Sequence, residues 1–274
     1  AVVFDAEGLD TAAMQAIAAE FNYSETTFVL PPVDPAHLAQ VRIFTPRFEM
    51  PFAGHPTVGT ALALAWRGRA SPGSQFVLEE KAGPVPVRLS QGEGGSVSAE
   101  FTAPQLPWHS SGVAAQPIAC ALGLAESDLI TTLGLPRAAS CGVPFLLVEL
   151  ASTEALGRAV LHGEGFLQAA ETKGVFLFVR RSAGDQFRAR MFAPGAGIVE
   201  DPATGSAAAA LAGYLGGRPG LADGWHSWDI RQGVEMGRPS LIATRARREG
   251  ERVVEVRVGG TAVPVMEGTL EAGA

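Results

Sequence analysis

The chain has 274 residues, of which 47% are hydrophobic and 18% charged, and its formal net charge is −7. This composition is that of a folded protein with a substantial core. Nucleic acids and anionic membranes reward a basic surface, so the negative balance disfavours both as partners. No apolar run reaches 18 residues, and residues 1–20 lack the basic region of a signal peptide. We therefore expect a cytoplasmic protein with no nucleic-acid or membrane partner.

Two cysteines and five histidines set limits on metal and thiol chemistry. Cys120 and Cys141 lie in apolar contexts, which favours two buried, inert thiols over a disulfide scaffold. The histidines are scattered along the chain, and no group of them has the spacing of metal ligands. The sequence thus predicts no metal site.

The first part of the chain alternates helical and extended patterns. Residues 11–21 place Met14, Ile17, Ala18 and Phe21 on one helical face. A second, very apolar helix is expected over residues 55–66, with Pro56 suited to its first turn. The β-branched and aromatic runs between Gly and Pro residues predict strands at 26–30, 41–44, 76–78, 85–88 and 97–101.

The second part has similar components. Helices are expected at 115–122 and 154–161, and strands at 145–149 and 176–180. Between the two parts, residues 103–113 gather Pro, Ser and Gly, which is typical of a linker.

A short sequence repeat relates the two parts. The segment RIFTP at residues 42–46 recurs as RMFAP at residues 190–194, which is 148 positions later (190 − 42). Each copy ends a predicted strand, and each is followed by a loop and then by a helix rich in small residues. The shared strand–loop–helix context indicates an internal duplication.

Both repeated helices are apolar on all sides, so each should be surrounded by protein rather than lie on a surface. Two half-barrels of strands, each wrapped around its own central helix, satisfy this requirement. We therefore predict an α+β fold of two pseudo-symmetric halves, with one half at residues 1–112 and the other at 113–258.

The starts of the two central helices are the expected place for chemistry. Gly54-His55 begins one helix and Gly205-Ser206 the other. Free N–H groups and a partial positive charge at a helix start bind anions such as carboxylates. This predicts a site for a small carboxylate between the halves. Ordinary alternatives stay open: Thr204 or Ser206 as helix caps, Asp201 as a turn residue, and His55 as a structural histidine.

Several segments together resemble the PhzF-like (phenazine biosynthesis) family of the diaminopimelate epimerase-like fold. The resemblance covers nearly the whole chain in order. The segments are NYSETTFVL (22–30), VRIFTPRFEMPFAGHPTVGTA (41–61), GIVEDPATGSAAAAL (197–211), QGVEMGRPSLI (232–242) and GGTAVPVMEGTL (259–270).

The resemblance implies two pseudo-symmetric halves, each a barrel-like sheet around a central helix, with residues 259–274 joining the first half. By motif, it implies Glu25 as the proton-carrying carboxylate, and His55 and Asp201 as its catalytic companions. Ser24, Gly54, Gly205 and Ser206 take the substrate-binding positions. It further implies an isomerase that moves a proton on a small carboxylate by general acid/base catalysis without a cofactor, and a homodimer.

Alternatives to this assignment remain at the level of the residues. Glu49 lies even closer in sequence than Glu25 to the GHP motif, Gly54-His55-Pro56, and the residues alone do not separate the two glutamates. The family match favours Glu25. Related epimerases use a pair of cysteines at the helix starts, and neither loop here holds a thiol. A non-catalytic metabolite-binding or interaction protein and a non-cysteine epimerase are the competing functions.

The family normally begins with a strand and a Gly-Asn-Pro turn that contributes to the substrate pocket. The sequence opens directly on the following strand, Ala1-Val-Val-Phe4. We expect the missing strand and turn to precede it in the full protein, because without them a core edge would be exposed.

Overall fold

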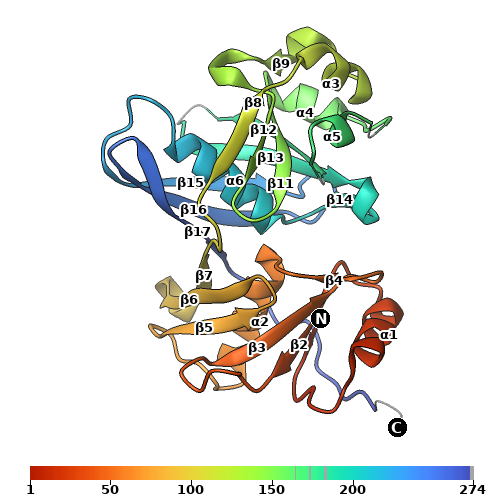
Figure 1. Ribbon diagram of the computed structural model, residues 1–274, viewed down its shortest axis with the longest axis vertical. Helices are drawn as coiled ribbons and strands as arrows, with labels where there is room; N and C mark the ends of the chain where they lie inside the picture. Colours follow the sequence, from red (N-terminus) through yellow and green to blue (C-terminus); the bar gives the residue numbers. More distant parts are fainter. Residues whose placement is uncertain (164, 173, 182–183, 272–274) are drawn as a thin grey trace. The chain divides into compact units, whose positions relative to one another are not determined.

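The computed structural model describes residues 1–163, 165–172, 174–181 and 184–271. The chain divides into two compact units (Figure 1). Unit 1 comprises Ala1–Pro104 and Gly259–Ala274, and unit 2 comprises Gln105–Val258.

Unit 1 is a twisted sheet with two helices. Its elements are β1 (Val2–Val3), α1 (Thr11–Phe21), β2 (Thr26–Leu30), β3 (Ala39–Phe44), β4 (Glu49–Met50), α2 (Gly54–Trp66), β5 (Gln75–Glu80), β6 (Gly83–Gln91) and β7 (Val97–Thr102). Strand β1 pairs in parallel with β2, and β2 pairs antiparallel with β3. Strand β3 then pairs antiparallel with β4 and in parallel with β5, from which β6 and β7 continue as an antiparallel meander.

Unit 2 repeats this plan with additions. Its elements are β8 (Trp108–Gly112), α3 (Ala115–Ala121), β9 (Leu129–Ile130), β10 (Arg137–Ser140), β11 (Pro144–Leu150), α4 (Thr153–Arg158), α5 (Gly165–Ala169), β12 (Gly174–Arg180), β13 (Gln186–Ala193), β14 (Ile198–Asp201), α6 (Gly205–Gly216), β15 (Gly224–Gln232), β16 (Ser240–Glu249) and β17 (Arg252–Gly260).

The pairing pattern of the two units confirms the pseudo-symmetry expected from the repeat. Strands β11 and β12 are parallel, as are β1 and β2, and β12–β13 and β13–β14 are antiparallel. Strand β13 pairs in parallel with β15, as β3 does with β5, and β16 follows antiparallel to β15. The helices α2 and α6 occupy the same place in this order, between the hairpin and the meander.

Both repeated helices are central, as their apolar sequences require. In α6 every residue except Ser206 is buried, and the helix packs against β8, β10, β11, β15 and β16 (Figure 1). In α2 the buried side includes Ala61, Leu62 and Leu64, which contact strands of unit 1. Strands cover α6 on all sides, whereas α2 keeps one partly exposed side that includes His55, Val58 and Trp66.

The surface helices behave as their periodicity predicts. Helix α1 begins after Asp10, whose side chain accepts a hydrogen bond from the Ala13 N–H at 2.8 Å. Its Met14 and Ala18 are buried against Phe28 and Phe44 in a small core under the sheet. The helix expected over residues 154–161 is shorter, since α4 ends at Arg158.

The segment expected to be a linker has structure of its own. Within residues 103–113, strand β8 pairs antiparallel with β10 and so adds an edge to the sheet of unit 2. The boundary between the units falls before it, between Pro104 and Gln105. This boundary lies inside the predicted linker, but over residues 108–112 strand pairing overrode local composition.

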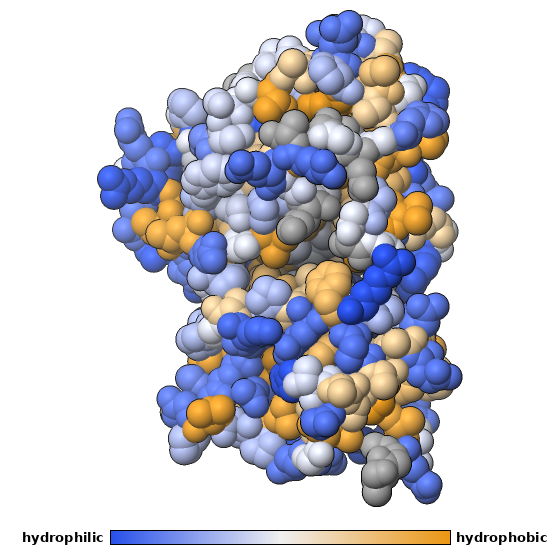
Figure 2. Space-filling model, turned by 45° about the vertical axis from the view of Figure 1, so that its right-hand side comes forward, coloured by the Kyte–Doolittle hydropathy of each residue, from blue (hydrophilic) through white to orange (hydrophobic). Residues whose placement is uncertain are grey.

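On the face drawn in Figure 2, hydrophobic residues lie singly or in small groups among hydrophilic ones. Scattered exposed apolar residues of this kind are ordinary on a folded protein. Among the described residues, no helix is both long enough and apolar enough to cross a membrane.

Candidate active-site residues in the two units

Glu25 lies in the turn that leads from α1 into β2, directly before the first residue of that strand. Its side chain is only 7% exposed. Strand β2 is paired on both sides, with β1 and with β3, so the backbone next to Glu25 is held in place. The position of the Glu25 side chain is therefore defined by the sheet. Ser24, the preceding residue, is half-buried in the same turn.

His55 meets this carboxylate from the start of α2. Its Nε2 lies 3.0 Å from Oε2 of Glu25, and its own side chain is 41% exposed. Gly54, the first residue of α2, is buried beside it. The unit thus pairs a shielded carboxylate with an imidazole that reaches solvent. An imidazole at this distance can donate a proton to a carboxylate or take one from it.

Helix α2 starts without a capping side chain, since its N-cap residue is Ala53. A buried glutamate of the neighbouring strand β5 nevertheless contacts this first turn of α2. Glu80, at the end of β5, is 6% exposed and accepts a hydrogen bond from the backbone of Ala53. It also lies 2.6 Å from the Thr57 hydroxyl. Burial raises the pKa of Glu80 to about 8, although these hydrogen bonds act in the opposite direction.

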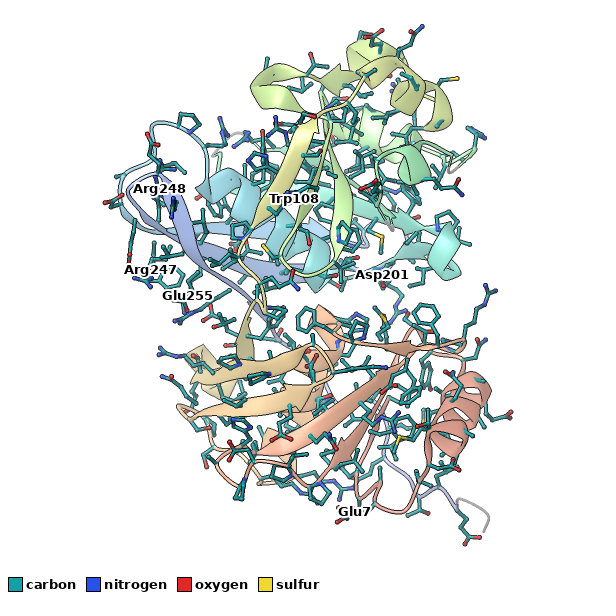
Figure 3. All side chains as sticks on the ribbon, in the orientation of Figure 1. Glu7, Trp108, Asp201, Arg247, Arg248 and Glu255 are labelled. Carbon is teal, nitrogen blue, oxygen red and sulfur yellow. The ribbon has the colours of Figure 1, made fainter. Side chains whose placement is uncertain are left out.

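In unit 2, Asp201 ends β14 and lies beside the start of α6 (Figure 3). It is 4% exposed, and its Oδ2 accepts a hydrogen bond of 2.6 Å from the Thr204 hydroxyl. Thr204 is the N-cap residue of α6, but its side chain does not cap the helix, because it is turned to Asp201. Gly205 is buried and Ser206 is half-buried in the first turn.

Glu49, the other candidate for the proton carrier, is held by cations. Its Oε1 accepts a 2.8 Å hydrogen bond from Arg42, and Lys81 lies 3.2 Å from its Oε2. The hydrogen bond from Arg42 is the largest cause that lowers the pKa of Glu49. The same pair recurs in unit 2, where Glu200 accepts two hydrogen bonds from Arg190 at 2.8 and 2.9 Å. Because the same Arg–Glu pair occurs in both units, it indicates a structural role for Glu49 in the repeated hairpin.

The two thiols are not alike. Cys120 is exposed, which corrects the expectation that both would be buried. Cys141 is buried, its Sγ donates to the Ala209 carbonyl at 3.4 Å, and burial raises its pKa to about 12. Neither lies in the turns that precede α2 and α6. Among the described residues, no three His, Cys, Asp or Glu side chains form a group that could hold a metal ion.

Sequence reasoning missed Glu80 and Gln232, the buried polar residues under the helix starts. Strand alternation contains the signal for them. Glu80 is in register with the buried Leu78 on β5, and Gln232 with the buried Ile230 on β15. A polar residue on the inward face of a strand needs a partner, and here that partner is the first turn of a helix.

The chain is similar over nearly its whole length to a known family of proteins. A family model for phenazine biosynthesis-like proteins (PhzC-PhzF) matches residues 1–268. A protein of Mesorhizobium japonicum named as an uncharacterized isomerase is 44% identical over 279 residues, covering 98% of this chain and 92% of the relative. The trans-2,3-dihydro-3-hydroxyanthranilate isomerase of Pseudomonas fluorescens is 38% identical over 98% of this chain and 92% of its own length.

Among solved structures, a PhzF-family protein of Bacillus anthracis matches with a TM-score of 0.84 at 25% identity, over 95% of this chain and 89% of that one. The fold is thus that of a pseudo-symmetric α+β isomerase. The chain belongs to the PhzF-like phenazine biosynthesis family.

Proposed function

We propose that this isomerase moves a proton within a small, cyclic carboxylate substrate by general acid/base catalysis, with Glu25 as the group that removes the proton and returns it. The observation that carries the proposal is the shielded Glu25 carboxylate 3.0 Å from the more exposed His55. Burial keeps bulk water away from the carboxylate, and His55 supplies a hydrogen-bond donor or proton acceptor beside it. The Pseudomonas relative acts, by its name, on a cyclic amino carboxylate.

The remaining site residues have supporting roles in the proposal. Asp201 acts as a second catalytic carboxylate, and Ser24, Gly54, Gly205 and Ser206 bind the substrate. The glycines leave room for a ligand close to the backbone, and the helix starts offer N–H groups to a carboxylate. These side chains need no cofactor for a proton shift. We also propose that the chain acts as a homodimer, which sedimentation analysis at several concentrations tests.

Deuterium exchange provides the decisive test. The protein is incubated in D₂O with trans-2,3-dihydro-3-hydroxyanthranilate and related cyclic carboxylates, and uptake is followed by proton NMR. The wild type should exchange and isomerise a substrate after dialysis against a chelator. Glu25→Gln should lower the rate by about 10²–10⁴-fold, the usual worth of a positioned acid/base group, and Asp201→Asn should also lower it.

The matched control is Glu49→Gln, which neutralises the competing glutamate. It should retain exchange, because Glu49 is committed to Arg42 and Lys81. Exchange by Glu25→Gln at the wild-type rate, or its loss in Glu49→Gln alone, would overturn the assignment. Tight ligand binding without any turnover would favour a non-catalytic member of the family, and chiral analysis of the product separates epimerisation from a proton shift.

A further inference from the structure

Glu80 is a buried acid that the proposed reaction does not use. It ends β5 beneath the first turn of α2, and it is 6% exposed. Its Oε1 lies 2.6 Å from the Thr57 hydroxyl. Its Oε2 is buried and has no hydrogen-bond partner among the described residues. An ionised carboxylate with an unsatisfied oxygen in such surroundings would be costly.

The Thr57 hydroxyl indicates which group carries the proton. That hydroxyl also lies 2.7 Å from the carbonyl oxygen of Ala53, which can only accept a hydrogen bond. A hydroxyl has a single proton, so it cannot donate fully to both the carbonyl and Glu80. Both short contacts are satisfied when Thr57 donates to Ala53 and a protonated Glu80 donates to Thr57.

Unit 2 holds the neutral equivalent of this arrangement. Gln232 ends β15, the strand that corresponds to β5, and is fully buried. Its Oε1 accepts from the Thr204 N–H at 3.1 Å, as Glu80 accepts from Ala53, the N-cap residue of α2. Its amide nitrogen donates to the Thr204 hydroxyl at 2.9 Å and to the Asp201 carbonyl at 2.7 Å. The amide of Gln232, which is neutral at every pH, thus holds the start of α6 by donating and accepting hydrogen bonds.

We propose that Glu80 is a positioning residue that, as a neutral acid, holds the first turn of α2 and with it His55, in the way that Gln232 holds the first turn of α6. The inference rests on the proposed function, in which His55 contacts Glu25. When Glu80 loses its proton, the donor to Thr57 disappears and a negative charge arises beneath the helix start. That charge disfavours an anionic substrate bound by the same N–H groups.

The surroundings favour the neutral form. Burial is the largest cause that raises the pKa of Glu80, to about 8. Nearby charges are engaged elsewhere. Arg42 and Lys81 bind Glu49, and Glu79 accepts from His37 at 2.9 Å. Glu80 borders a hollow of about 290 Å³. The other charged residues that line this hollow are Arg42, Glu49, Glu79 and Lys81.

Other ionisable groups lie on the elements that pack against α2. His55 is on the helix itself and contacts Glu25. Arg88 is on β6 and Glu100 is on β7, the strands that cover the helix. None of these charged groups is a cause of the raised pKa of Glu80, which follows from burial.

The kinetic test compares Glu80→Gln with Glu80→Ala between pH 6 and 10. Glu80→Gln, whose amide can donate to Thr57, should keep kcat/KM at pH 7 within about threefold of wild type and lose the decline that sets in near pH 8. Glu80→Ala should lose tenfold or more in kcat. Equal damage from both variants, or an unchanged alkaline decline in Glu80→Gln, would overturn the proposal.

A second test is independent of activity. The pKa of Glu80 in the folded protein, about 8, lies above the ordinary value of 4.5 for a glutamate. The contribution of Glu80 to stability is therefore fully present below about pH 4.5 and is lost as the pH rises to about 8. The urea midpoint of the wild type should fall relative to that of Glu80→Gln across this window and then level off. A constant difference would show that Glu80 is ionised in the folded protein.

Matched controls complete the design. Glu7→Gln removes a glutamate from the exposed surface of unit 1 and should produce no such pH-dependent difference (Figure 3). Gln232→Glu introduces the acid in unit 2 and should create the same window of lost stability. Because the urea arm needs no substrate, it still reports on Glu80 if no isomerase substrate is found, so failure of the two proposals can be told apart.

Discussion

Glu25 and Glu49 show how neighbours separate two side chains of the same type. Both precede the GHP segment, and both are largely shielded from solvent. Glu49 accepts from Arg42 and lies beside Lys81, so it is held as an anion by two cations. The neighbour of Glu25 is the imidazole of His55, whose Nε2 lies 3.0 Å from Oε2 of the carboxylate. A neighbour that is not a permanent cation suits the role that we propose for Glu25.

The two cysteines give a prediction at the same scale. Only the thiolate reacts with alkylating agents, and burial raises the pKa of Cys141 to about 12. Iodoacetamide at pH 8 should therefore modify the exposed Cys120 in the folded protein and leave Cys141 untouched. Mass spectrometry should find a single modification, and a second one after denaturation in guanidinium. Rapid modification of Cys141 in the native protein would show that the core around Ala209 opens.

At the scale of elements, the repeat preserves a strand pair and its ion pair. Arg42 of β3 and Arg190 of β13 each reach a glutamate on the short strand that follows, Glu49 or Glu200. Each arginine also lies over the phenylalanine two residues later, at 5.1 and 4.7 Å from the ring centroid. The RIFTP and RMFAP segments are thus alike because each one builds the same hairpin before a central helix.

The two arginines should differ in their effect on stability. Arg190 is 8% exposed, and besides binding Glu200 it donates to the carbonyls of Leu156 and Ala159. Arg190→Ala removes a buried guanidinium and leaves the partly shielded Glu200 and two carbonyls without their donor, a loss of about 3–5 kcal/mol. Arg42→Ala should cost about 1 kcal/mol, because Glu49 keeps Lys81 and Arg42 is more exposed. Urea denaturation at pH 7 measures both, and equal losses would contradict this account.

At the scale of the whole molecule, the two units divide the chain unevenly, and the closing segment belongs to the first. Residues 261–271 are exposed throughout, and the pair between Arg67 and Glu267, at 3.1 Å, lies on the surface of unit 1. A surface ion pair of this kind contributes about 0–1 kcal/mol.

Truncation after Gly260 should therefore lower Tm by no more than about 2–4 °C, the shift that about 1 kcal/mol produces in a chain of this size class. Differential scanning calorimetry makes the measurement, with Glu267→Gln as the control for the ion pair alone. A fall of 10 °C or more would show that the tail packs on the fold.

The sequence by itself determined the parts that depend on local pattern. Strand β2 lies at the predicted residues, helix α1 also matches, and the repeat at Arg42 and Arg190 correctly indicated two pseudo-symmetric halves around apolar helices. These features follow from periodicity and burial, which are written into neighbouring residues. Strand β8 was missed, because an edge strand is defined by its partner β10 and not by its own composition.

Only the tertiary structure decided how the candidate residues are partnered. It joined Glu25 to His55 across 30 positions of sequence (55 − 25), tied Glu49 to Arg42, and placed Glu80 under the first turn of α2. The reason is physical: a carboxylate's proton affinity and orientation depend on burial and on the groups within a few ångströms, and folding alone brings those groups together.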